Sequence, residues 1–506
     1  MYHAVKASAQ LRAPFQSQWR LQNQWSRLRS LTSVSKQSPK QPNPSIAAMP
    51  LRDMPGPPVL ANLARYTREG FRNHHTVIEK LFEQYGPTFQ FAMPGKKVVY
   101  VCDPDDVERV FRAEGYPSSR GDLLMLATYH EQAKGLLRSF NGDDESWHVH
   151  RSAVAPKLLL RGVLKPFFPD LCNVADDTIA RFKEGRNLGI EYHLNKLAGE
   201  SVAVLLFGEC IGVNAESPNP SAKDFIKAVN GYFSAEAKLM FSIPLHKYVK
   251  TPTLKELYHC LDKQWKITRH FLDKVNQERS PLAKQCLVHR LAKEDKIPQE
   301  EVLQICQGLF AGGTHTTASN LLVTLHILSK YPEAQQRMYD EIEAVLPDKQ
   351  QPTLDQILQM RYVRASLKEA FRIQPSPIGN IRRLQLPVVV GGYEVPPGIM
   401  IFLSAVASKS IQKKKYGADF ESFRPERWLR GTEDKIHPFA SLPFGFGPRM
   451  CAGKRLAELE MYIFLVRLLQ KYEIVESSHE DDQVEWYFNV VHNPTTPYNL
   501  KLKKRM

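Results

Sequence analysis

The sequence predicts a mainly helical protein with a minor β-sheet, and two observations carry that prediction. From about residue 60 onward, apolar residues recur mostly at helical intervals, whereas only a few short segments alternate in the manner of strands. The same stretch holds no second linker, repeat or low-complexity tract. One large domain is therefore expected over residues 59–506.

Individual elements follow from local signals. The clearest helix is expected from about Glu300 to Lys330, where apolar residues keep helical spacing. Tyr331-Pro332 should end it, because the residue before a proline avoids helical backbone. Thr353 and Gln356 have the spacing of a capping box, which predicts another helix start. Strands are expected over 98–102, over 388–395 with a break at Gly391-Gly392, and over 400–403.

The first 52 residues have a composition of their own. They contain no Asp or Glu, but they hold eight lysines and arginines and eight serines. An acid-poor start rich in Arg and Ser is typical of a mitochondrial transit peptide. We therefore expect a leader over residues 1–45 and a proline-rich linker over residues 46–58. A disordered basic tail that binds nucleic acid or membrane is the alternative.

Hydropathy and cysteine spacing exclude other classes. No run approaches the ~20 apolar residues that span a bilayer, which argues against an enzyme anchored by a membrane helix. The seven cysteines are scattered along the chain. This scatter indicates reduced thiols rather than a disulfide framework or a zinc site.

Cys451 lies in a loop punctuated by glycines, Phe-Gly-Phe-Gly-Pro-Arg-Met-Cys-Ala-Gly over residues 444–453. Glycines let the backbone turn closely around a bulky flat partner. Arg449 supplies a cation, and a helix start after the loop favours a thiolate. A haem iron takes such a thiolate as its axial ligand. The alternative is a buried structural cysteine in a glycine-rich turn.

Five residues of this loop occupy the fixed positions of the pattern Phe-x-x-Gly-x-Arg-x-Cys-x-Gly. The loop therefore resembles the haem-binding loop of the cytochrome P-450 monooxygenases. The resemblance implies a single-domain cytochrome P-450 fold and a haem b cofactor. It also implies that Cys451 binds the iron and that Phe444 and Arg449 contact the cofactor.

Further motifs occur in the order of that family. Trp147 and Arg151 match its Trp-x-x-x-Arg, whose i, i+4 spacing brings both side chains to one helix face. The resemblance implies that both bind a haem propionate, together with Arg382; the neighbouring Arg383 stays open. It also implies a buried structural network, made by Glu369, Arg372 and Arg427.

The segment 311–317, Ala-Gly-Gly-Thr-His-Thr-Thr, lies within the longest predicted helix. Two adjacent glycines cost ~1 kcal/mol each relative to alanine there. They indicate either a groove for dioxygen or close helix packing. Thr316 matches the family threonine that hydrogen-bonds bound oxygen, whereas His315 replaces the usual acid before it. A histidine of ordinary pKa titrates near neutrality, so His315 is a candidate proton relay.

Four cations match the positions with which mitochondrial members bind a [2Fe-2S] ferredoxin. Arg364 and Lys368 precede the Glu369 motif, and Lys454 and Arg455 follow the cysteine. A solvated basic face is the alternative. Together with the leader, this match predicts an enzyme of the matrix side of the inner mitochondrial membrane. It should contact that membrane peripherally and bind no nucleic acid.

The expected substrate is a sterol-like lipid that receives one oxygen atom of O2, with electrons from NADPH through ferredoxin reductase and the ferredoxin. His315 and the segment 378–380 also resemble arthropod ecdysteroid-making members. The alternatives are an isomerase or dehydratase of a lipid peroxide, which needs no external electrons, and a non-enzymatic haem binder. The expected apolar pocket wall consists of Leu123, Leu124, Leu126, Tyr232, Phe233, Phe310, Ala311, Ile378 and residues 488–491.

Overall fold

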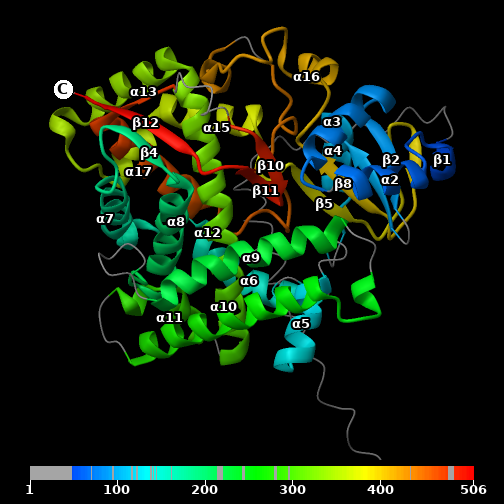
Figure 1. The fold of residues 1–506 in the computed structure, drawn as a ribbon, viewed down its shortest axis with the longest axis horizontal. Helices are drawn as coiled ribbons and strands as arrows, with labels where there is room; N and C mark the ends of the chain where they lie inside the picture. Colours follow the sequence, from blue (N-terminus) through cyan, green and yellow to red (C-terminus); the bar gives the residue numbers. More distant parts are fainter. Residues whose placement is uncertain are drawn as a thin grey trace, which may run out of the picture. The chain divides into compact units, whose positions relative to one another are not determined.

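The computed structural model is mainly helical, as the sequence predicts, and Figure 1 shows the sheet that contains β2 (Thr88–Met93) and β8 (Met400–Ser404) to one side of a large helical body. The structure describes residues 48–505 apart from short gaps. These gaps are residue 70, 94–95, 116–117, 121–123, 137–139, 141, 144, 161, 213–219, 242–244, 278–281, 294–296, 433–434 and 477–483.

Helix α12 runs through the middle of the helical body (Figure 1), and α8, α9, α10, α15 and α17 all pack against it. The helices are α2 (Val59–Glu69), α3 (His74–Tyr85), α4 (Pro104–Arg112), α5 (Leu124–Lys134), α6 (Glu145–Leu159), α7 (Phe168–Ile179), α8 (Ile190–Phe207), α9 (Pro220–Phe241), α10 (Pro252–Gln277), α11 (Leu287–Ala292), α12 (Gln299–Lys330), α13 (Pro332–Val345), α14 (Leu354–Gln359), α15 (Arg361–Ile373), α16 (Lys409–Tyr416) and α17 (Lys454–Lys471).

The predicted helix limits are confirmed at both ends of α12. It starts after Pro298 and stops at Tyr331, which is the residue before a proline. Its sequence is apolar on most sides, and most of its residues are buried. The capping box before α14 also forms, since Thr353 and Gln356 bond each other's backbone reciprocally.

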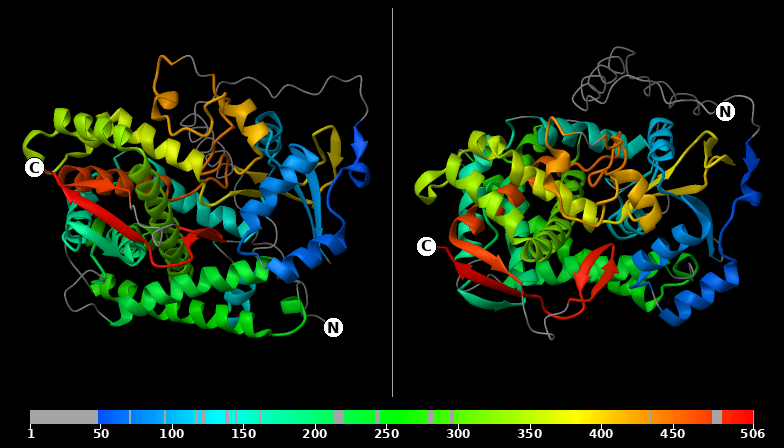
Figure 2. Two further views of the ribbon diagram at one scale, coloured as in Figure 1. Left: turned by 45° about the horizontal axis from the view of Figure 1, so that its top comes forward. Right: turned by 90° about the horizontal axis from the view of Figure 1, so that it is seen from above.

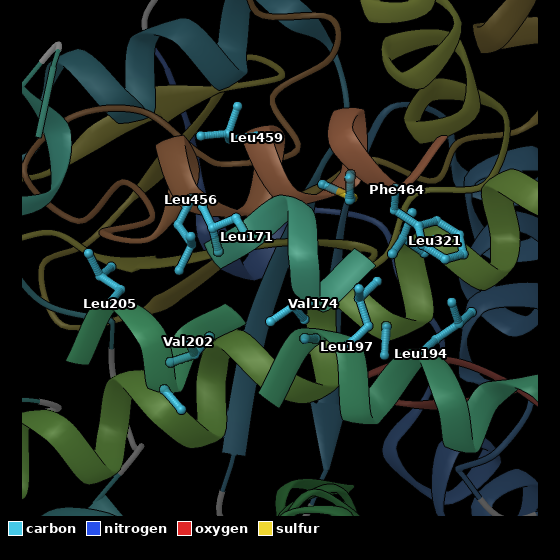
Figure 3. Close-up of a cluster of buried hydrophobic side chains, with 14 of the residues drawn as sticks. Leu171, Val174, Leu194, Leu197, Val202, Leu205, Leu321, Leu456, Leu459 and Phe464 are labelled. Carbon is cyan, nitrogen blue, oxygen red and sulfur yellow. The ribbon is translucent and has the colours of Figure 1, made fainter. Parts of the chain in front are cut away.

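Side chains from α7, α8, α12 and α17 form one continuous apolar core (Figure 3). Leu197, Leu321 and Phe464 are each at most 1% exposed within it. Burying a side chain of this size stabilises a fold by roughly 1.5–3 kcal/mol. This core fixes α12 against α17, the helix that begins directly after the cysteine loop.

The strands form small sheets of two to four strands in the described part of the chain. The largest has the order β2-β3-β8-β5, and its pairs β3–β8 and β8–β5 are parallel and antiparallel, respectively. Strands appear at the predicted segments as β3, as the β6–β7 hairpin and as β8. The bounds are β1 (Met49–Pro50), β2 (Thr88–Met93), β3 (Lys96–Val101), β4 (Gly185–Leu188), β5 (Gly379–Arg383), β6 (Val388–Val390), β7 (Tyr393–Val395), β8 (Met400–Ser404), β9 (Tyr472–Val475), β10 (Trp486–Asn489), β11 (Val491–Pro494) and β12 (Asn499–Lys504).

The start of the folded domain differs from the expected boundary at residue 59. Strand β1 pairs in parallel with β7, and Met54 is only 2% exposed. Residues 48–58 are therefore part of the folded body rather than a free linker, because a distant strand supplies their backbone partners. The expected leader over 1–45 lies outside the described residues.

Two sequence-based exclusions agree with the structure. All seven cysteines are free, which confirms the prediction of reduced thiols. Across the described ranges, no helix is both long and apolar enough to cross a membrane.

Candidate active site

The cysteine loop turns tightly before α17. The amide of Cys451 donates to the carbonyl of Phe444 (2.9 Å), which closes the turn. Gly445 and Gly447 adopt φ values of 69° and 79°, a left-handed backbone that favours glycine. A Cβ on Gly445 would also lie 2.7 Å from a neighbouring side-chain oxygen. The backbone of the loop can therefore approach a flat partner closely, as the sequence predicts.

Opposing effects act on the thiol of Cys451. Burial raises its pKa above the usual value. A hydrogen bond from the Gly453 backbone and the guanidinium groups of Arg151 and Arg120 lower that pKa. The loop thus offers positive charge and a backbone donor to a thiolate, the form in which cysteine binds a metal.

Four buried or half-buried arginines surround the loop. Arg151 donates through Nη2 to the carbonyl directly before Cys451 (2.8 Å), and Arg382 donates through Nη2 to another carbonyl of the loop (2.9 Å). Arg449 belongs to the loop itself. Arg120, which no sequence motif marked, donates through Nη2 to the carbonyl of Arg449 (2.5 Å). Tertiary packing alone brings Arg120 into this cluster.

Nearby carboxylates neutralise only part of this positive charge. Glu114 pairs with Arg382, with 2.9 Å between Oε1 and Nε, and both side chains are at most 2% exposed. Asp143 lies 3.4 Å from Nη2 of Arg449. These two acids face four guanidinium groups in the described part of the cluster.

The remaining charge is costly unless further anions bind. Burial and the neighbouring arginines lower the pKa of Arg120 to about 10 and that of Arg449 to about 9. Among the residues that the structure describes, the buried Nε atom of Arg151 has no hydrogen-bond partner. Two carboxylates, such as the propionates of a haem, would balance this cluster and bond the free donor. The residues present therefore fit a haem whose iron is bound by Cys451.

Trp147, the aromatic member of the predicted set, contacts the arginine of the cysteine loop. The guanidinium carbon of Arg449 lies 3.6 Å from the ring centre of Trp147, a stacked cation–π contact. Arg449 also donates to the carbonyls of Ser118 and Gly142. Trp147 therefore holds Arg449 in place beside the cysteine loop.

Strand geometry places Arg382 and its neighbour Arg383 in different surroundings. Successive side chains of β5 point to opposite faces of the sheet. Arg382 is 1% exposed and bonds the cysteine loop, whereas Arg383 pairs through its backbone with Ser119. Arg382 is therefore the residue that belongs to the cluster.

The two glycines of α12 have separate environments. A Cβ on Gly313 would lie 2.6 Å from a valine of α8, so this glycine permits close helix packing. A Cβ on Gly312 would meet nothing within 4 Å. The hydroxyl of Thr316 donates to the carbonyl of Gly312 (2.7 Å). Gly312 and Thr316 thus share the open side of the helix, where the groove is expected.

His315 is buried where α12 packs against α9. Its side chain is 5% exposed, and its ring stacks on Phe233 of α9 with 5.0 Å between ring centres. Both ring nitrogens are buried, and neither has a hydrogen-bond partner in the described ranges. Burial lowers the pKa of His315 to about 4, so the imidazole is neutral near pH 7 and does not titrate there.

The predicted buried network forms in full. Arg372 donates to both carboxylate oxygens of Glu369 (2.9 and 2.8 Å), and Arg427 Nε donates to Oε1 (2.8 Å). The indole of Trp428 donates to Oε2 (2.7 Å), and the backbone amide of Arg424 donates to Oε1 (3.0 Å). Five donors satisfy one fully buried carboxylate, which indicates a structural role.

One residue of the expected pocket wall lies elsewhere. Phe310 is fully buried, and its ring stacks on Phe225 (3.9 Å between centres) and contacts Phe207 edge-on. It therefore fills the core between α8, α9 and α12 instead of lining a pocket. Of the other expected wall residues, Leu126, Tyr232, Phe233, Ala311, Ile378, Phe488 and Val491 are buried, whereas Leu123 and the side chain of Leu124 lie outside the described residues.

The four cations predicted to bind a ferredoxin lie along α15 and at the start of α17. Burial lowers the pKa of Lys368, and the charges of Arg364 and Lys454 lower it further. Arg455 is exposed beside them, and Glu458 is a nearby acid. The structure thus assembles one basic face next to the cysteine loop from two distant segments.

The arrangement of helices is that of a known fold. The haem domain of cytochrome P450DA superposes with a TM-score of 0.76, over 91% of this chain and 99% of that one. The two sequences are only 17% identical, so the likeness shows the fold alone.

Fold and cysteine site together define a haem-thiolate oxygenase. Residues 54–502 match the sequence profile of the family Cytochrome P450, and the chain belongs to that family. It is therefore a monooxygenase with a haem iron cofactor. This class is favoured over the peroxide isomerase and over the non-enzymatic binder.

Similar curated proteins include mitochondrial members of the family. The rat protein "1,25-dihydroxyvitamin D(3) 24-hydroxylase, mitochondrial" is 29% identical over 437 residues, which cover 84% of each chain. The Drosophila melanogaster protein "Probable cytochrome P450 12a5, mitochondrial" is 29% identical over 86% of this chain and 87% of its own. "Cytochrome P450 27C1" of Danio rerio is 28% identical over 90% of this chain and 87% of its own.

Proposed function

We propose that this protein is a mitochondrial hydroxylase of a sterol-like lipid, supplied with electrons by NADPH through ferredoxin reductase and a [2Fe-2S] ferredoxin. The observation that carries the proposal is the basic face beside the cysteine loop, in a chain similar to relatives named mitochondrial. When bound, the haem supplies the activation of O2 for insertion into a C–H bond.

The basic face fits an acidic electron donor. Arg364 and Lys368 lie one turn apart on α15, and Lys454 and Arg455 open α17 directly after the cysteine loop. A donor bound there would lie close to Cys451 and its cofactor. Charge complementarity at such a rim accelerates association and makes it sensitive to salt.

Thr316 is the residue we infer to handle protons at the reacting oxygen. Its hydroxyl lies on the open side of α12 and already donates to the carbonyl of Gly312. That bond leaves the hydroxyl oxygen free to accept a further hydrogen bond, so it can hold a proton donor at the groove. The neutral imidazole of His315 is kept as a second candidate, with the test given below.

Exposed apolar residues support peripheral contact with the inner mitochondrial membrane. Leu245, Tyr248 and Val249, in the connection between α9 and α10, are 55%, 85% and 59% exposed. Leu60 on α2 is 78% exposed. Two turned views show the start of α2 close to that connection (Figure 2). An apolar patch of this kind beside exposed Lys250 fits an anionic lipid surface.

The leader and the location have a direct test. Mature protein from the source tissue should lack residues 1 to about 45 and should fractionate with mitochondrial inner membranes on the matrix side. A chain that still begins at Met1 and sediments with the endoplasmic reticulum would contradict the mitochondrial assignment.

For the substrate, the vitamin D hydroxylase among the relatives favours the sterol class. Within that class we infer an ecdysteroid precursor, on the resemblance of His315 and the segment 378–380 to arthropod members. The test is a Soret-shift screen of the holoenzyme against sterols and steroids, followed by turnover with NADPH, reductase and ferredoxin. Product formation from a lipid hydroperoxide, without any electron donor, would instead support an isomerase.

A further inference from the structure

Helix α9 carries a buried acid that the oxygen chemistry does not use. Glu236 is 6% exposed, and so is Tyr232, which lies one helical turn before it. The Tyr232 hydroxyl donates to the Glu236 carboxylate. Burial raises the pKa of Glu236 to about 7, because its surroundings are apolar. A buried carboxyl group is costly unless its hydrogen bonds are made.

The acid lies on the inward face of α9. On that face, Phe225 stacks on α12 at Phe310, and Phe233 stacks on α12 at His315. Glu236 is three residues after Phe233, so the two side chains share the face. The face toward α10 is a different one: a Cβ on Gly231 would lie 2.8 Å from a sulfur of α10.

The same part of α9 leads toward the hairpin β10–β11. Figure 1 shows α9 crossing α12 and running toward the side that carries the hairpin, and α9 contacts β10. The hairpin contains residues 488–491, which the sequence places in the wall of the substrate pocket. At its tip, Val490 has φ 62°, a strained value for a β-branched residue. Glu236 therefore lies on the face of α9 toward α12, in a helix that also contacts the hairpin of the expected pocket wall.

A comparison with Glu369 shows what Glu236 lacks. Glu369, which is also buried, accepts hydrogen bonds from five donors. Among the described residues, Tyr232 is the polar partner that Glu236 has. A carboxylate offers about four acceptor positions, and a carboxylic acid also offers one donor. Within the described part of the chain, Glu236 thus keeps hydrogen-bonding capacity beyond its bond with Tyr232.

We propose that Glu236, held by Tyr232, binds a hydroxyl group of the substrate at a distance from the haem. This inference rests on the proposed sterol function and narrows it to a sterol that carries a second hydroxyl group, in addition to the one on its first ring. A hydroxyl both donates and accepts, so it matches the carboxyl group in either protonation state. Glu236 is then a specificity residue, because a ligand without that hydroxyl leaves a buried polar group unpaired.

The test uses spectral titration of the holoenzyme with cholesterol and with side-chain and ring hydroxylated cholesterols. Wild type should bind one hydroxylated member roughly 10–100-fold more tightly than its deoxy partner. Glu236→Leu should abolish that preference by weakening the hydroxylated ligand, with the deoxy ligand unchanged or tighter. Glu236→Gln, which keeps a donor and an acceptor, should retain part of it.

The controls separate the two proposals. Asp224→Leu removes an exposed carboxylate from the same helix and should leave the preference as in wild type. Tyr232→Phe keeps the ring but removes the hydroxyl that bonds Glu236, so it should reduce the preference for the hydroxylated ligand. This variant tests the Tyr232–Glu236 pair even if Glu236→Leu loses haem. If the preference is unchanged in both Glu236→Leu and Tyr232→Phe, Glu236 does not bind the substrate hydroxyl. That result would leave the sterol function standing. A wild-type protein that responds to no sterol of the set would overturn the sterol function as well.

Discussion

The Nη2 atom of Arg151 lies 2.8 Å from the carbonyl oxygen of Met450, the residue directly before Cys451. This hydrogen bond joins α6 to the cysteine loop. The Nε atom of the same guanidinium group is buried without a partner. Arg151 therefore has one donor on the loop and another available to a haem propionate.

We expect Arg151→Gln to weaken haem retention. The change removes a charge-assisted bond worth roughly 1.5–3 kcal/mol, so haem transfer to apomyoglobin should become about tenfold to a hundredfold faster. The measurement is the rate of that transfer, followed at the Soret band. Arg52→Gln, at a side chain 85% exposed, is the control and should match wild type. Equal transfer rates in both variants would remove Arg151 from the haem site.

Cys451→Ser should abolish the long-wavelength Soret band of the reduced protein with carbon monoxide. An alcohol is far harder to ionise than a thiol, so the cations around the loop cannot convert serine into an equivalent anionic ligand. Cys210→Ser changes an exposed free cysteine and should keep the band. Survival of the band in Cys451→Ser would show that another residue binds the iron.

Sequence alone predicted the parts of the site that are encoded locally. The cysteine loop was predictable because its glycines, Arg449 and Cys451 lie within ten residues and each serves that short turn. The Glu369 network was predictable only through a family resemblance, since its two motifs are far apart. Nothing local marks Arg120, which reaches the loop through packing, so the sequence did not reveal it.

The sequence also left undetermined how deeply individual side chains are buried and which residues cover them. Helical spacing identified α12 but did not show which neighbour covers each side chain. Phe310 proved to be core, and His315 proved to be covered by Phe233, which shifts its pKa away from neutrality. The early start of the folded body has the same origin, because β1 depends on the distant β7 for its partners.

The double variant Arg364→Glu/Lys368→Glu should impair electron delivery specifically. Each reversal replaces an attraction to an acidic ferredoxin with a repulsion, so the ferredoxin Michaelis constant should rise about tenfold. Its dependence on salt should flatten at the same time. The measurement is NADPH-driven turnover against ferredoxin concentration at several ionic strengths.

The control for the charge reversals is Lys263→Glu/Lys266→Glu, at two exposed lysines of α10. Its net charge change is the same, but it leaves α15 and α17 untouched. Sterol affinity, read from the Soret shift, should stay at the wild-type value in both double variants. A ferredoxin dependence that is identical in the two would place the docking surface elsewhere.

Burial of His315 makes a prediction about acid stability. The native pKa of about 4 lies below the unfolded value of 6.5, so the unfolded chain binds the extra proton in that interval. The contribution of this residue to stability is therefore complete above pH 6.5 and falls as the pH drops toward 4. At about pH 5.5 the loss should amount to about 1.4 kcal/mol.

His315→Phe should remove this part of the acid sensitivity, because an aromatic ring of similar shape can stack on Phe233 without a titratable group. Unfolding free energies at about pH 8 and about pH 5.5 give the difference, and the variant should lose about 1.4 kcal/mol less than wild type. His259→Phe, at an exposed histidine of α10, is the matched control and should not reduce the loss to the same extent.

The same proteins test whether His315 relays protons. A neutral imidazole should make the ratio of peroxide to product independent of pH around neutrality. A wild-type ratio that changes with a midpoint near 6.5, and becomes flat in His315→Phe, would show that His315 titrates in the working enzyme and relays protons beside Thr316.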